Sequence, residues 1–100
     1  MAIDEPHQPD LQQDIMRASQ AKQVLTAPIY RESWEEVRRR IVEQLESAEV
    51  APERRARLND LLVAHKKARQ YLEQVMNTGK LAELEINRRL SLVQRIRQVI

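Results

Sequence analysis

Apolar residues recur every three or four positions along most of the chain, which is the spacing of amphipathic helices. The first such stretch predicts a helix over residues 10–26, with Asp10 as its N-cap and Gln13 as the capping-box partner. We expect it to end before Pro28, because a residue that precedes proline is biased away from helical angles. The same proline suits the first turn of a second helix over residues 28–47. The stripe of this second helix is the most regular in the chain and consists of Tyr30, Trp34, Val37, Ile41, Leu45 and Ala48.

The pattern then predicts a third helix over residues 52–77 and a fourth over residues 80–100. The boundary lies at Gly79, the only glycine in the chain, because Asn and Gly accept the left-handed backbone angles found at helix ends. The sequence leaves open whether Gly79 breaks the helix or merely bends it. The third stripe consists of Leu58, Leu61, Leu62, His65, Ala68, Leu72, Val75 and Met76, and the fourth of Leu81, Leu84, Ile86, Leu90, Leu92, Val93, Ile96, Val99 and Ile100.

Together these stretches predict an all-α fold with a single helical domain over residues 10–100. The short link before Pro52 favours an antiparallel helical hairpin of the second and third helices, flanked by an N-terminal and a C-terminal helix. One glycine and four prolines leave little turn material for many short strands. Residues 1–9 contain two prolines and no periodicity, so we expect an extended N-terminal arm.

The fourth stripe is wide and reaches the end of the chain, which makes it the candidate protein interface. Two interpretations stay open. The helix folds back onto the second and third helices, or its apolar face docks on another molecule, as contiguous exposed apolar patches commonly do. A fully buried Leu or Ile contributes roughly 1.5 to 3 kcal/mol, so several of them would decide where the helix docks. The interface candidates are Leu90, Val93, Ile96, Val99 and Ile100.

Composition excludes several classes of protein. The chain has no cysteine, which rules out disulfides and thiolate metal sites. No apolar run approaches the roughly 18 residues needed to span a bilayer, and the acidic start MAIDEPHQPD lacks the apolar core of a signal peptide. The net charge of +2 comes from 17 basic and 15 acidic residues, a near balance that produces a weak overall field.

The usual signs of enzyme chemistry are weak. Gly79 and Lys80 lack the second glycine and the following Ser or Thr of a phosphate-binding loop. His65 has no second ligand at helical spacing, so a packing or hydrogen-bonding role is favoured over zinc. The glutamates lie on solvated helix faces beside arginines, and no histidine is spaced to activate a serine. We therefore expect no catalytic residues, metal, cofactor or small-molecule substrate. Tyr30 and Trp34 are expected to lie in the core.

Two basic runs are the candidates for nucleic-acid contact. The runs could bind phosphate backbones, but glutamates precede several of the arginines by four residues, the favourable arrangement for ion pairs within a helix. No aromatic residues are interleaved for base stacking. Binding to DNA therefore remains an alternative rather than the leading interpretation. The candidate residues are Arg38, Arg39, Arg40, Arg54, Arg55 and Arg57.

Three segments together resemble a group of small helical proteins encoded by tailed bacteriophages and prophages. They are AKQVLTAPIYRESWEEVRRRIVEQL, then ERRARLNDLL, then YLEQVMNTGKLAELE. The resemblance covers roughly residues 18–86, and its most specific part is Leu72 to Ala82. Members of the group tend to be encoded among head, packaging or other virion genes. The resemblance supplies no catalytic or binding residue, but it implies a role in phage particles and their assembly.

The leading hypothesis is a non-enzymatic virion or assembly protein that acts through helix packing and arm capture on capsid, portal, tail or internal proteins. Phage particles are symmetric, so a homo-oligomer is expected, located in the virion or in the host cytoplasm during assembly. The first alternative is a DNA-packaging accessory similar to a small terminase subunit. The second is a phage inhibitor of a host protein.

Overall fold

The computed structural model describes residues 10–99, and all regular structure in this part of the chain is helical. Helix α1 spans Leu11–Thr26, α2 spans Pro28–Glu46, and α3 spans Pro52–Val99. The prediction of an all-α fold is confirmed. The predicted arm over residues 1–9 and the interface candidate Ile100 lie outside the described residues.

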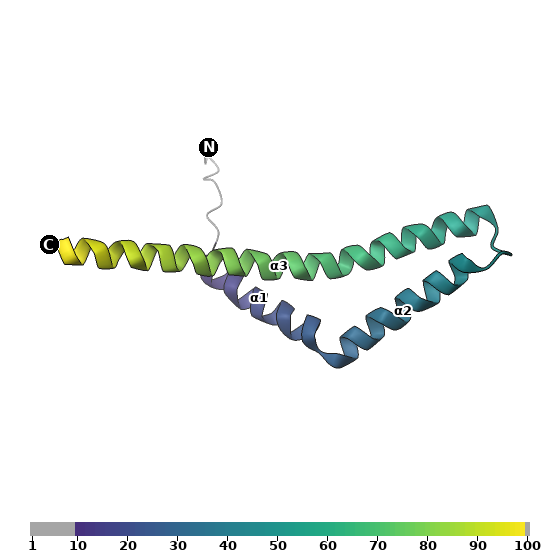
Figure 1. The fold of residues 1–100 in the computed structure, drawn as a ribbon, viewed down its shortest axis with the longest axis horizontal. Helices are drawn as coiled ribbons and strands as arrows, with labels where there is room; N and C mark the ends of the chain where they lie inside the picture. The colour runs from purple at the N-terminus through teal and green to yellow at the C-terminus, as the bar shows by residue number, and fades with distance from the viewer. Residues whose placement is uncertain (1–9, 100) are drawn as a thin grey trace, which may run out of the picture.

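The first two helices begin and end where local chemistry predicts. The Asp10 side chain accepts a hydrogen bond from the Gln13 backbone N–H at 3.1 Å, so the predicted N-cap is confirmed. Ala27 alone separates α1 from α2 and is extended, with φ −67° and ψ 124°. Pro28 enforces this conformation on the residue before it and then occupies the first turn of α2. The result is a sharp corner between two helices (Figure 1).

Helix α3 is 48 residues long and passes through Gly79, so the predicted division into helices over residues 52–77 and 80–100 is wrong. Of the two possibilities left open for Gly79, a break is excluded. No glycine or other described residue has a positive φ. The glycine serves a different purpose, because it lies buried where α1 crosses α3. A Cβ atom built on Gly79 would lie 2.1 Å from the Ala18 Cβ and 2.9 Å from the Asp14 carbonyl oxygen. The absence of a side chain therefore permits the two backbones to approach closely.

The helices α1 and α2 lie in tandem along α3 and run antiparallel to it (Figure 1). The start of α1 contacts α3 at Gly79, and Trp34 of α2 contacts His65 further back along α3. The corner at Ala27 is the part of this pair that lies farthest from α3 (Figure 1). Four apolar side chains are buried along the two contacts, namely Ala21, Ile41, Leu58 and Ala82.

The molecule is long and thin. Its principal extents are 76 × 43 × 17 Å, and its radius of gyration is 21.5 Å. A compact domain of this length would have a radius of gyration of about 13 Å. The first part of α3 lies beside α1 and α2, whereas its last turns extend alone beyond the start of α1 (Figure 1). Little apolar surface is therefore buried within one copy of the chain.

The role of Gly79 predicts that adding one methyl group there destabilises the fold. In a free helix, Gly79→Ala would stabilise by about 1 kcal/mol, but the new Cβ would collide with Ala18 and with the α1 backbone. We expect a net loss of about 1 to 3 kcal/mol in the free energy of unfolding, measured by urea denaturation. The exposed Asn77→Ala, two residues away, is the control and should raise stability slightly. A Gly79→Ala chain more stable than wild type would contradict the close crossing.

Candidate protein interaction surface

The last turns of α3 form an exposed apolar surface. We call residues 87–99 the projecting segment; every residue in it is exposed. Val93 and Ile96 are 45% and 58% exposed, and Leu90 and Val99 are 56% and 88% exposed. The interpretation that this helix folds back onto the hairpin is wrong, because α3 continues without a turn and carries these residues away from α1 and α2. The described interface candidates therefore lie together on an uncovered helix.

A heptad repeat runs through the covered and uncovered parts of α3. Sequence reasoning missed it, because the predicted helix boundary at Gly79 separated the apolar stripe into two. Apolar or small residues, interrupted by His65 and Arg89, recur in strict alternation of three and four positions, the spacing of a coiled-coil seam. Up to Ile86, all but Leu61 and Ala68 of these residues are buried or half-buried. Beyond Ile86 the same seam has no cover. Its described members are Leu58, Leu61, His65, Ala68, Leu72, Val75, Gly79, Ala82, Ile86, Arg89, Val93 and Ile96.

Ion pairs within the helix support the beginning of the projecting segment. Glu85 accepts hydrogen bonds from Arg88 Nη2 at 2.7 Å and from Arg89 Nε at 3.0 Å. The hydrogen bonds from Arg88 first and Arg89 second lower the pKa of the Glu85 carboxyl to about 2. These contacts bridge the last half-buried turn of α3 and its first uncovered turn, so they help the helix to persist where tertiary packing ends.

The covered part of the seam is held by a cluster around Trp34. The rings of Trp34 and His65 stack with centroids 4.6 Å apart, and the Arg69 guanidinium lies 4.8 Å from the Trp34 ring centroid. His65 Nε2 lies 2.8 Å from the Trp34 carbonyl oxygen, and the Trp34 indole N–H donates to the His65 carbonyl at 3.4 Å. The predicted packing and hydrogen-bonding role of His65 is confirmed. Trp34 itself is half-buried rather than fully enclosed.

Most of the six arginines predicted to contact nucleic acid form hydrogen bonds or ion pairs with other groups of the chain. Arg39 pairs with Glu36 and Glu43, and Arg40 pairs with Glu36 at 3.0 Å. The hydrogen bonds that Glu36 accepts, from Arg39 first and Arg40 second, lower the pKa of its carboxyl to about 2. The local matching of charge expected for this run is therefore present on α2.

The second basic run closes the hairpin turn. Arg54 donates to the Gln44 side chain at 2.8 Å. Arg55 donates to the Leu45 and Ser47 carbonyl oxygens at 2.8 and 3.3 Å, which satisfies acceptors that the end of α2 leaves free. Among the six arginine candidates, Arg38 and Arg57 form neither a hydrogen bond nor an ion pair within residues 10–99. Contact with DNA stays a prediction.

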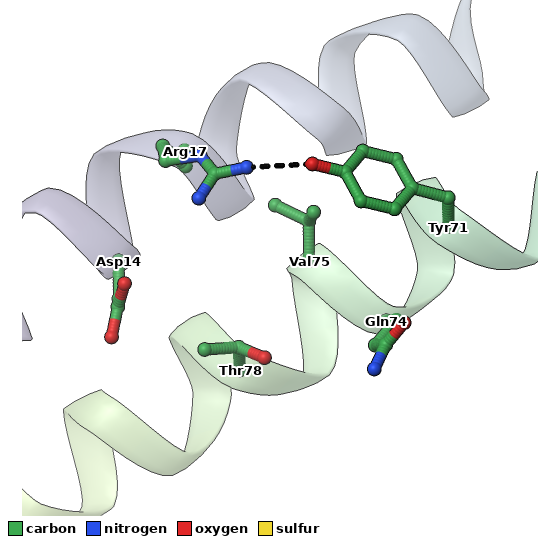
Figure 2. Close-up of a pocket in the computed structure, with 6 residues that line it drawn as sticks. All are labelled: Asp14, Arg17, Tyr71, Gln74, Val75 and Thr78. Carbon is green, nitrogen blue, oxygen red and sulfur yellow. Dashed lines mark hydrogen bonds between the residues drawn. The ribbon is translucent and has the colours of Figure 1, made fainter. Parts of the chain in front are cut away.

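A small hollow lies where α1 and α3 separate after their crossing (Figure 2). Its volume is about 200 Å³, below the range of about 300 to 1,000 Å³ typical of small-molecule sites. Arg17 Nη2 donates to the Tyr71 hydroxyl at 3.0 Å across its rim, and Val75 lies between the two helices (Figure 2). The hydrogen bond ties α1 to α3, so we interpret the hollow as part of the helix contact. Its lining residues are Asp14, Arg17, Tyr71, Gln74, Val75 and Thr78.

The described residues provide neither a metal-binding cluster nor a helix that could span a membrane. No group of three or more His, Cys, Asp or Glu side chains between residues 10 and 99 is arranged to hold a metal ion. None of the three helices is long and apolar enough to cross a membrane.

The chain shows no significant match to any protein-family model, curated protein or solved structure. The resemblance to phage proteins therefore remains a hypothesis.

The ion pairs of Glu85 predict a pH response confined to low pH. Because its folded pKa is lowered from 4.5 to about 2, the stabilisation is present above about pH 4.5 and is lost as the pH falls towards 2. An NMR titration should place the Glu85 carboxyl midpoint near 2 and show a loss of helical chemical shifts at Arg88 and Arg89 over the same range. The Glu85→Gln variant should lack this step, and Glu83→Gln should keep it. A midpoint near 4.5 would show that the pairs do not persist in solution.

Proposed function

We propose that the chain is a non-enzymatic assembly protein that acts by helix packing. The observation that carries this proposal is the small core, because only four apolar side chains are buried while fourteen large apolar side chains are exposed among the described residues. Soluble monomers rarely expose contiguous apolar surface, and such patches usually mark sites of interaction. Docking would bury this surface at roughly 25 cal/mol per Å² of apolar area.

In this proposal the two parts of α3 have different tasks. The hairpin formed by α1, α2 and the first part of α3 is the base, joined by the Trp34 cluster and the crossing at Gly79. The projecting segment is the docking element. Because it continues the same helix, it leaves the base in a fixed direction, and no flexible link has to be ordered when a partner binds.

The proposed setting is a tailed phage particle or its assembly in the host cytoplasm. The similarity of residues 18–86 to small helical phage proteins supports this setting. The partners would be virion proteins such as capsid, portal, tail or internal proteins. The symmetry of such particles favours multiple copies, and the N-terminal arm would be captured by a neighbouring chain.

Substitution of the projecting segment tests the docking role. We expect Val93→Glu together with Ile96→Glu to weaken docking at least about a hundredfold, because two apolar side chains contribute roughly 1.5 to 3 kcal/mol each when buried. Thermal unfolding of the base should change little, since neither residue contacts it. Incorporation into particles is measured by quantitative mass spectrometry after the variant replaces the wild-type chain.

The matched control is Ser91→Glu together with Gln98→Glu, which adds the same charge to the opposite face of the same turns. We expect this control to enter particles at wild-type levels. Equal incorporation of both double variants would contradict docking through this face. Loss of both would show that added charge alone causes the defect, and the proposal would then be wrong for this segment.

Composition of the particle tests the setting. We expect purified particles of the encoding phage to contain the chain in a fixed copy number that matches a symmetry of the particle, measured by mass spectrometry against a capsid-protein standard. A wash at high salt should not remove it, because apolar packing is not weakened by screening. Absence of the chain both from particles and from isolated assembly intermediates would contradict a role in assembly.

A further inference from the structure

We propose that the uncovered seam of α3 pairs with the same segment of a second copy of this chain, antiparallel, around a two-fold axis near the level of Ser91. This inference rests on the proposed function, because it identifies one docking partner of the projecting segment. Three features of α3 support the pairing: the continuity of the seam, the register that its residues favour, and the positions of Glu83 and Arg97 beside the seam.

The seam continues from an interface that already exists. In the base, the heptad positions of α3 up to Ile86, except Leu61 and Ala68, are buried or half-buried, and α1 and α2 run antiparallel to α3 beside them. Val93 and Ile96 continue the same positions and are exposed, and no helix among the described residues covers them. A helix that continued the cover would lie where α1 lies in the base and run in the same antiparallel direction.

A second copy of the projecting segment supplies such a helix in a good register. Antiparallel coiled coils place each first heptad position opposite a fourth position of the partner. With the axis at Ser91, Arg89 lies opposite Val93 of the second copy. Ile96 of the second copy lies opposite the half-buried Ile86, at the edge of the base, and packs on the part of Ile86 that the base leaves exposed. The symmetry repeats both layers, so four layers form from one set of residues.

Arg89 explains why the pairing would be antiparallel. It is the only charged residue among the described seam positions. In a parallel pair in register, Arg89 would face Arg89 of the second copy, and the two like charges would repel each other. In the antiparallel pair its aliphatic stem packs against Val93 of the second copy, while its guanidinium keeps the contact with Glu85 at 3.0 Å.

The flanking positions agree with the same direction. Glu83 and Glu85 lie just before the projecting segment, Arg88 and Arg89 at its start pair with Glu85, and Arg95 and Arg97 lie near its end. The antiparallel pair brings Glu83 beside Arg97 of the second copy, twice by symmetry. It also brings Leu90 beside Leu90 of the second copy, which would cover a side chain that is 56% exposed in one copy. The parallel pair would bring Leu92 beside Arg97 and form no Glu–Arg pair.

The seam beyond the base is short, about two heptads, so we expect self-association on the order of micromolar rather than nanomolar. Sedimentation equilibrium of the full chain should therefore show a monomer–dimer equilibrium over about 1 to 500 µM.

Cysteine pairs test the register directly, because the natural chain has no cysteine. Arg89→Cys and Val93→Cys chains are oxidised separately and as an equimolar mixture. Only the mixture places two cysteines in one layer, so we expect its disulfide yield to exceed that of either chain alone by about tenfold. Ser91→Cys, on the opposite face, measures random collision. Efficient cross-linking of each chain alone would indicate a parallel pair and overturn the proposal, as would a mixture no better than the Ser91→Cys background.

A charge exchange tests the flanking contacts. Glu83→Arg and Arg97→Glu should each weaken the dimer on the order of tenfold, since each replaces two attractive pairs by two repulsive ones. The double variant restores opposite charges at both sites and should return to within about threefold of wild type. A double variant as weak as the single ones would overturn the antiparallel register.

The two proposals fail in different ways. If the purified chain stays monomeric at all concentrations while Val93→Glu with Ile96→Glu still excludes it from particles, the self-pairing is wrong and docking on a different chain stands. If the cysteine mixture cross-links as expected but particles and assembly intermediates lack the chain, the self-pairing stands and the proposed function is wrong.

Discussion

Gly79 and Ala18 let α1 cross α3 so closely that a single added Cβ would come within 2.1 Å of its neighbour. Because the residues at the crossing are small, the two helix backbones lie in direct contact. Surface is therefore buried there without large side chains. The crossing also determines where α1 begins along α3. Because α1, the corner at Ala27 and α2 have a fixed combined length, this one contact sets how much of α3 is covered and how much projects.

The projecting segment is helical although little of it packs against the rest of the chain. An isolated helix is marginal in water, but propagation from an existing helix is much easier than nucleation of a new one. The first part of α3 packs in the base, and Glu85 pairs with Arg88 and Arg89 at the point where packing ends. The projecting segment therefore needs no core of its own to be helical. It remains apolar on one side because the heptad repeat of the base continues into it.

Much of the fold could be predicted from the sequence, because capping residues, prolines and apolar spacing determine where α1 and α2 lie. Asp10 and Pro28 mark the starts of α1 and α2, and the Trp34 stripe marks the packed face of α2. The error at Gly79 has a physical reason. Glycine ends helices when it adopts left-handed angles, but it also sits inside helices where another backbone approaches, and only tertiary structure distinguishes the two. The heptad spacing through Gly79 was the available signal, because a true helix end would interrupt the register.

The candidate interaction surface could be predicted only in part from the sequence. Apolar spacing identified Val93 and Ile96, but it could not show whether they fold back or project, since both arrangements need the same residues. That choice depends on whether the chain turns at residue 79, and therefore on a contact with Ala18, 61 residues earlier. The thin core has a consequence for stability as well. A molecule that buries so little alone gains stability when a partner covers the seam, so its apparent stability would depend on the concentration of that partner. In the proposed docking, binding of a partner and folding of this chain would be linked through the same row of side chains on α3.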